Sequence, residues 1–178
     1  WDGPPNERPP VLAEPADAGI VVNLSGDLHC FFAGTPFDPE VPARRLVEFT
    51  TGSSSSTTCL RGVGRLVADP GVPESVAMAA SAVGALLADR VARPNPHLAF
   101  HELEQNGFSL MEAGPDALTA ELVFVSPEDV ARAVLPEPLE TRLRSERFGV
   151  PADGSGHERE IGGSFWRWDT DSMSWVAL

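Results

Sequence analysis

The chain has 178 residues, a formal net charge of -13 at pH 7 and 42% hydrophobic residues. This length is sufficient for one domain with a sizeable core. The negative charge argues against a nucleic-acid-binding surface or an anionic membrane as partner, because both require a basic footprint. We expect no membrane span, since the longest apolar run, at 76–87, is short and interrupted by Ser81 and Gly84.

The first residue is Trp1, and nothing near it has the charged, apolar and small-residue pattern of a signal peptide. We therefore expect the amino terminus of the protein to lie upstream of this residue. Residues 2–18 are rich in proline and polar side chains, which predicts a crossover loop leading into the first strand.

A strand is predicted at 20–24, where a β-branched run between Gly19 and Gly26 is typical of a strand buried on both faces. Asp27 and His29 follow its carboxyl end, where ligands bind in open α/β sheets. If the chain stays extended there, these two side chains point to the same side. A carboxylate beside an imidazole suits a divalent or trivalent metal. A simple turn with a structural histidine remains the alternative on spacing alone.

A second strand is predicted at 45–51, where apolar and polar residues alternate, and it runs into the segment GSSSSTT at 52–58. Thr51 and Ser53 are possible pocket-lining residues, because hydroxyls and backbone amides at this strand end could face the same pocket as Asp27. The alternative is a flexible serine-rich linker, which the composition by itself favours.

The clearest helix is predicted at 73–92, where an apolar stripe recurs at helical spacing and Pro94 ends it. Asn95 and His97 follow and are possible pocket-lining residues. For Asn95, the flanking prolines indicate a turn. His97 could reach a metal or a phosphate, but a hydrogen-bonded structural histidine is the favoured interpretation.

Two further strands are predicted at 108–112 and 118–125, joined by a turn at 114–116 as a hairpin at a sheet edge. Ser126 then has the features of a helix cap, with Pro127 in the first helical position. A helix at 139–148 is also predicted, on the basis of a Glu and Arg pair four residues apart.

The end of the chain carries Trp166, Trp168 and Trp175, which are too apolar for a free tail and predict a terminal hairpin that packs on the body. The two cysteines, Cys30 and Cys59, fit no zinc pattern. Neighbouring strands could bring them together, and we favour two free or packed thiols over a disulfide.

Four segments carry a family resemblance in their order and rough spacing. They are WDGPPNERPPVL at 1–12, IVVNLSGDLHCFFA at 20–33, RLVEFTTGSSSST at 45–57 and RPNPHLAFHELEQNGFSLMEAGPDALTAELVFV at 93–125. Together they resemble the carboxyl-terminal part of PhoD-like alkaline phosphatases, which belong to the metallophosphoesterase superfamily. The chain departs from the family pattern at Pro4, where an aromatic residue is usual.

The resemblance implies an α/β fold, part of a metallophosphoesterase-type β-sandwich flanked by helices. We divide the chain into 1–135, the carboxyl-terminal part of the metallophosphoesterase domain, and 136–178, a tail with a short helix and the Trp-rich hairpin. By the same resemblance the protein is a metal-dependent phosphatase or phosphodiesterase, exported to the periplasm or the cell exterior. It hydrolyses phosphate esters through a metal-activated water.

The resemblance also assigns Asp27 and His29 as metal ligands, His29 to the softer transition metal and Asp27 to the harder ion, with iron and calcium as the metals. It places no catalytic residue here beyond these ligands. The remaining ligands are expected in the missing amino-terminal part of the protein, so these 178 residues alone are expected to be inactive. The alternative function is a non-catalytic binding or structural module that keeps the fold.

Overall fold

The computed structural model describes residues 12–13, 20–38, 40–41, 45–68, 71, 73, 95–132, 134 and 138–178. None of the helices formed by these residues combines the length and the apolar composition that a membrane span requires. The strands are β1 (Val22–Ser25), β2 (Phe31–Gly34), β3 (Val47–Thr50), β4 (Leu98–Glu102), β5 (Asn106–Ala113), β6 (Ala117–Val125), β7 (Leu143–Pro151), β8 (Glu158–Ile161), β9 (Ser164–Asp169) and β10 (Ser174–Ala177). The helices are α2 (Cys59–Ala68) and α4 (Pro127–Val130), with a 3-10 turn at Leu139–Thr141.

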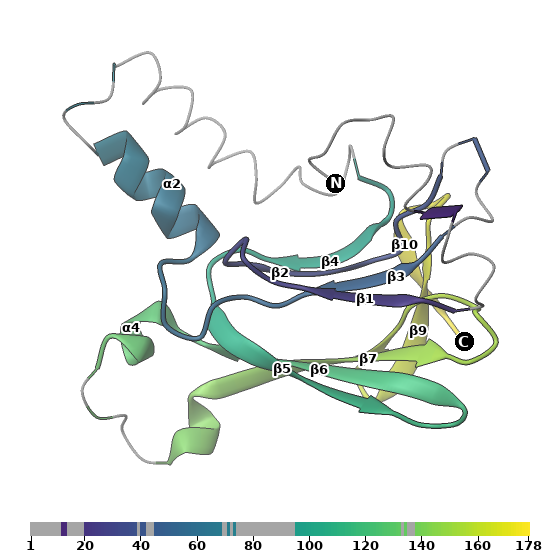
Figure 1. The fold of residues 1–178 in the computed structure, drawn as a ribbon. Helices are drawn as coiled ribbons and strands as arrows, with labels where there is room; N and C mark the ends of the chain where they lie inside the picture. Colours follow the sequence, from purple (N-terminus) through teal and green to yellow (C-terminus); the bar gives the residue numbers. More distant parts are fainter. Residues whose placement is uncertain are drawn as a thin grey trace.

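The strands form two sheets that lie one over the other (Figure 1). The first has four strands in the order β1-β3-β2-β4, and β1 and β3 run parallel while β2 is antiparallel to β3 and β4. The second has six strands in the order β10-β9-β8-β7-β6-β5, all antiparallel. The carboxyl ends of β1 and β3 therefore meet at one end of the first sheet.

One apolar core joins the two sheets, because alternate side chains of their strands face each other across the interface. Its buried members are Phe31, Ala33, Val47 and Phe49 from the first sheet and Ala120, Leu122, Phe124, Phe148 and Val150 from the second. The ring of Phe31 packs edge to face on Phe124 at 4.9 Å, and Phe49 packs on Phe148 at 5.9 Å. This core is the rigid support on which the strand ends are mounted.

The described residues are mostly β, so the α/β class predicted from the sequence is only weakly represented. The helix predicted at 139–148 is wrong, since β7 occupies 143–151 and pairs with β6 along its whole length. Phe148 and Val150, two residues apart on this strand, both belong to the buried core. The helix expected at 73–92 lies outside the described residues, apart from position 73.

The first strand is also less buried than predicted. Because β1 is the edge strand of its sheet, Leu24 is 57% exposed and Val22 is half-buried, although both faces were expected to be covered. The β-branched run therefore predicted the strand correctly, but the prediction that both of its faces are buried is wrong.

Other predictions are confirmed. The hairpin of β5 and β6 lies at the edge of the second sheet, and Leu118 faces the core with its alternate neighbours. Ser126 caps α4, accepting a hydrogen bond from the amide of Asp129 at 3.1 Å, with Pro127 next to it.

The terminal hairpin is present as β9 and β10, in which Trp168 lies opposite Trp175 with ring centroids 5.3 Å apart. The indole of Trp168 donates to the carbonyl of Pro96 at 3.0 Å. Residues 143–177 thus extend the sheet begun by β5 and β6 and contact the segment before β4.

Candidate functional site

The loop at 26–30 connects β1 to β2 at the carboxyl end of β1. The amide of Thr51 donates to the carbonyl of Ser25 at 2.9 Å, which places the ends of β1 and β3 side by side. Within the loop, the amide of Leu28 donates to the carbonyl of Gly26 at 2.9 Å. The loop therefore follows the strand end as expected, with the residues after β3 beside it.

The backbone of this loop is not extended. Asp27 has φ 71° and His29 has φ 55°, both in the left-handed region that L-residues seldom adopt. The extended chain assumed from the sequence is thus wrong, and the two side chains do not take their direction from strand alternation. Asp27 is exposed and His29 is half-buried.

The ring of His29 is held by the segment that precedes α2. Its Nδ1 lies 2.6 Å from the carbonyl oxygen of Thr57. Because a carbonyl oxygen only accepts, Nδ1 must carry the proton, and the lone pair of the neutral ring is then on Nε2. Metal-binding histidines are commonly oriented in this way, with one nitrogen donating to a carbonyl and the other free for the ion.

Two more hydrogen bonds fix this arrangement. The amide of Cys59 donates to the carbonyl of His29 at 3.1 Å, so backbone and ring of the histidine are both tied to 57–59. Arg65 of α2 donates to the hydroxyl of Thr57 at 2.5 Å. The helix therefore positions Thr57, and Thr57 positions His29.

The serine-rich turn after β3 is ordered by side-chain hydrogen bonds. The hydroxyl of Ser53 accepts from the amides of Ser55 at 3.3 Å and Ser56 at 2.9 Å. From β5, the side-chain amide of Asn106, which is 2% exposed, donates to the carbonyls of Ser53 and Ser56 at 2.9 and 2.8 Å. The turn is thus held in one shape rather than acting as a flexible linker.

The turn is also anchored to both sheets. The hydroxyls of Thr51 and Ser109 lie 2.7 Å apart, which joins the end of β3 to β5. At Gly52 a Cβ would lie 2.5 Å from the ring of Phe31, so this position has room for glycine alone. The structure thus brings Thr51 and Ser53 to the same end of the molecule as Asp27 and His29.

Asn95 and His97 lie at the other end of the first sheet. They precede β4, whose first residue pairs with Gly34 at the far end of β2, and the carbonyl of His97 accepts from the amide of Thr35 at 2.8 Å. The loop with Asp27 precedes the opposite end of β2. The structure therefore does not bring these two residues together with Asp27 and His29.

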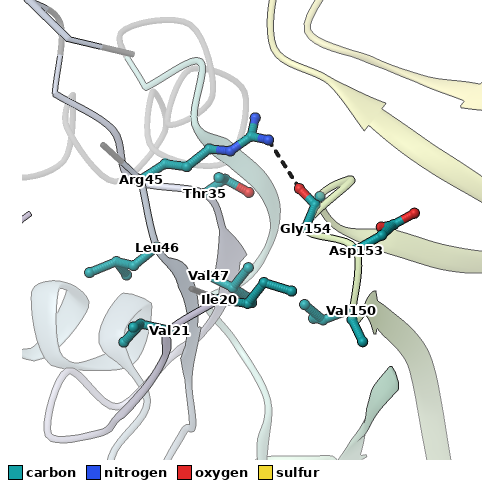
Figure 2. Close-up of a pocket in the computed structure, with 11 residues that line it drawn as sticks. Ile20, Val21, Thr35, Arg45, Leu46, Val47, Val150, Asp153 and Gly154 are labelled. Carbon is teal, nitrogen blue, oxygen red and sulfur yellow. Dashed lines mark hydrogen bonds between the residues drawn. The ribbon is translucent and has the colours of Figure 1, made fainter. Parts of the chain in front are cut away.

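A cavity of about 390 Å³ also lies at that far end (Figure 2). Ile20 and Val21, just before β1, and Leu46, just before β3, line one side of it. Arg45 donates to the carbonyl of Gly154 at 3.0 Å. The other side is lined by Val150, Ala152, Asp153, Gly154 and Gly156. Because it is at the start of β1 and β3, this cavity is separate from the strand-end loop.

Whether the loop could bind a metal is judged from the chemistry of its two candidate ligands. An exposed carboxylate at Asp27 and an oriented imidazole at His29 are one hard and one borderline ligand, which suits an iron or calcium ion of the kind the family resemblance implies. Over the described residues, no group of three or more His, Cys, Asp or Glu side chains could hold a metal. Asp27 and His29 therefore remain two candidate ligands, predicted from the sequence.

Sequence reasoning missed Thr57, which holds the ring of His29, and Asn106, which holds the serine-rich turn, and it also missed α2. A helical signal existed in the apolar spacing of Leu60 and Val63, but two glycines at 62 and 64 disfavour a helix. Asn106 carried no local signal, since its partners lie fifty residues away in the sequence.

The fold and this loop define a two-sheet, mostly β protein with a polar site at the carboxyl ends of its parallel strands. The family model of PhoD-like phosphatases matches residues 1–122, and the chain belongs to the PhoD-like phosphatase family. This membership confirms the resemblance found in the sequence and implies a hydrolase that acts on phosphate esters. Searches of curated proteins and of solved structures found no match.

Proposed function

We propose that Asp27 and His29 are metal ligands of a metal-dependent phosphatase that hydrolyses phosphate monoesters or diesters. The observation that carries this proposal is the hydrogen bond from Nδ1 of His29 to the carbonyl of Thr57, at 2.6 Å. It fixes the tautomer in which Nε2 offers a lone pair, in the loop where the family resemblance implies a ligand.

In this proposal His29 would coordinate iron and Asp27 would coordinate calcium, because an imidazole suits a transition metal and an exposed carboxylate suits a hard cation. Metal ions bound there supply Lewis acidity and neutralise charge on the phosphate oxygens. The residues of this chain hold and orient the ligands: Thr57 fixes the ring, and the 51–56 turn forms the wall beside it. Such a local positive centre explains how a chain of net charge -13 receives an anionic substrate.

The backbone of the loop supports a functional role. Left-handed conformations at residues other than glycine cost on the order of 1–3 kcal/mol each and persist where surrounding structure holds them. Here Asp27 and His29 both carry one, inside the loop at 26–30, which is tied to α2 by the hydrogen bond from the amide of Cys59 to the carbonyl of His29. A simple connection between β1 and β2 would not require this strain.

Two ligands are fewer than the three protein ligands that catalytic metal sites usually keep. We therefore propose that the 178 residues alone have no turnover and that the further ligands lie upstream in the same protein. Export to the periplasm or the cell exterior is part of the proposal and rests on the family resemblance. Metal-dependent hydrolysis of a chromogenic phosphate ester by the isolated chain would contradict the first point.

The test uses the full-length protein with His29→Ala and Asp27→Asn. Both variants should lose metal, measured by elemental analysis, together with turnover, while circular dichroism stays unchanged because the loop is outside the core. Asp153→Asn, an exposed carboxylate beside the separate cavity, is the matched control and should retain metal. If the two site variants keep the metal content and rate of the parent, the loop is only a turn, and a non-catalytic module becomes the better assignment.

A further inference from the structure

The two cysteines of the chain lie next to each other beside the loop. Cys30 directly follows His29 and is 1% exposed, while Cys59 begins α2 and is half-buried. The amide of Cys59 donates to the carbonyl of His29 at 3.1 Å, so Cys59 lies beside the backbone of the residue that precedes Cys30. Both thiols are free. Two segments whose cysteines are 29 residues apart in the sequence thus lie side by side, joined by a backbone hydrogen bond.

We propose that Cys30 and Cys59 form a reversible intramolecular disulfide when the protein meets an oxidising disulfide such as oxidised glutathione. The chain has two cysteines, so this is its single possible internal disulfide. A disulfide requires the sulfur atoms to approach to about 2.0 Å. The backbone hydrogen bond between Cys59 and His29 already holds the two cysteine segments side by side, so the sulfur atoms reach that distance by side-chain rotation, without a change of the fold.

The reaction proceeds in two exchange steps. The more accessible thiol, Cys59, attacks oxidised glutathione, forms a mixed disulfide and releases one reduced glutathione with its proton. Cys30 then attacks the Cys59 sulfur, the mixed disulfide breaks, and a second reduced glutathione leaves. The two cysteine sulfurs are oxidised by two electrons in total, and one glutathione disulfide is reduced to two thiols.

This disulfide would act on the candidate metal loop. His29 is tied to the 57–59 segment by its ring and by its carbonyl, and the disulfide adds a covalent link at the next residue. Oxidation therefore fastens the loop to the start of α2, while reduction leaves it held by hydrogen bonds alone. The disulfide itself does not depend on the proposed function; its influence on a metal ligand does.

The experiment measures disulfide formation in the purified chain across mixtures of oxidised and reduced glutathione, by mass spectrometry and by titration of free thiols. In the folded chain, the expected product has lost two hydrogen atoms and both thiols. Its equilibrium constant should exceed that in concentrated urea by about 100-fold or more, as the entropy of a closed loop of this length predicts. The oxidised protein should melt about 5–15 °C higher than the reduced one.

Amide hydrogen exchange supplies a second readout, in which oxidation should slow exchange of the Cys59 amide that bonds His29. Cys59→Ser is the matched control and should show neither the mass change nor the slower exchange. Glutathione retained on Cys59, a disulfide between two chains, or equal equilibrium constants in buffer and urea would each overturn the proposal. Since the comparison with urea uses the unmodified chain, it stands even if a cysteine variant folds poorly.

Discussion

Acidification should destabilise this protein through His157. The residue precedes β8, is 1% exposed, packs on the ring of Phe49 at 5.0 Å, and has Nδ1 3.0 Å from the hydroxyl of Thr35. Its Nε2 has no hydrogen-bond partner among the described residues. Burial lowers the pKa of His157 from 6.5 to about 3, because the charged ring would lose its hydration.

The direction in which stability changes with pH depends on which state of the protein, folded or unfolded, binds the proton of His157. Below its ordinary pKa of about 6.5 the histidine is protonated in the unfolded chain, whereas in the folded chain it stays neutral until about pH 3. The unfolded state therefore binds more protons in this window, and stability is lost as the pH falls through it. Between about pH 7.5 and about pH 5 the loss is about 2 kcal/mol, or about 4–8 °C in Tm.

Thermal melts followed by tryptophan fluorescence, at the two pH values, provide the measurement. His157→Gln removes the titrating ring, so its Tm should fall between these pH values by about 4–8 °C less than that of the parent. The control Thr35→Val removes the hydrogen bond to Nδ1 but leaves the ring buried. Its Tm should therefore fall between the two pH values by as much as the Tm of the parent. If the Tm of the parent and the Tm of His157→Gln fall equally between these pH values, His157 is not the source of the pH dependence.

Further predictions concern backbone space and the turn beside the candidate site. Gly107→Ala should destabilise by more than about 2 kcal/mol in urea unfolding, since φ is 151° and the new Cβ would lie 1.9 Å from the carbonyl oxygen of Val123. Gly64→Ala should instead stabilise α2 by about 0.5–1 kcal/mol, because its Cβ would meet nothing within 4 Å; destabilisation there would count against the helix. Asn106→Ala leaves two carbonyls of the serine-rich turn unpaired and should cost about 1–3 kcal/mol, with faster proteolysis of that turn; unchanged proteolysis would mean that other contacts hold it.

The β5 and β6 hairpin could be predicted because its information is local. A turn rich in glycine and proline separates two alternating runs, and Ser126 with Pro127 marks the next helix start within two residues. The loop after β1 could be placed at a strand end for the same reason. Its left-handed backbone could not, because the loop is held by contacts such as the hydrogen bond from Cys59 to His29, whose partners are distant in sequence.

The failure at 139–148 has a different cause. A Glu and Arg pair four residues apart favours a helix only when nothing else competes, and here β6 offers a partner strand for every residue from Leu143 to Pro151. Arg144 contacts Glu102 at 3.8 Å rather than the predicted Glu140. Tertiary pairing thus outweighed a local preference worth only a few tenths of a kcal/mol.

The shared core has a consequence for the order in which the chain is synthesised. The buried face of the first sheet, with Phe31 and Phe49, packs against Phe124 and Phe148, which leave the ribosome about a hundred residues later. Until then these rings have no partner surface, and at about 5–20 residues per second they wait for several seconds. During synthesis this face of the first sheet therefore lacks its partner rings until β6 and β7 have been made, and until then it can bind chaperones or other nascent chains.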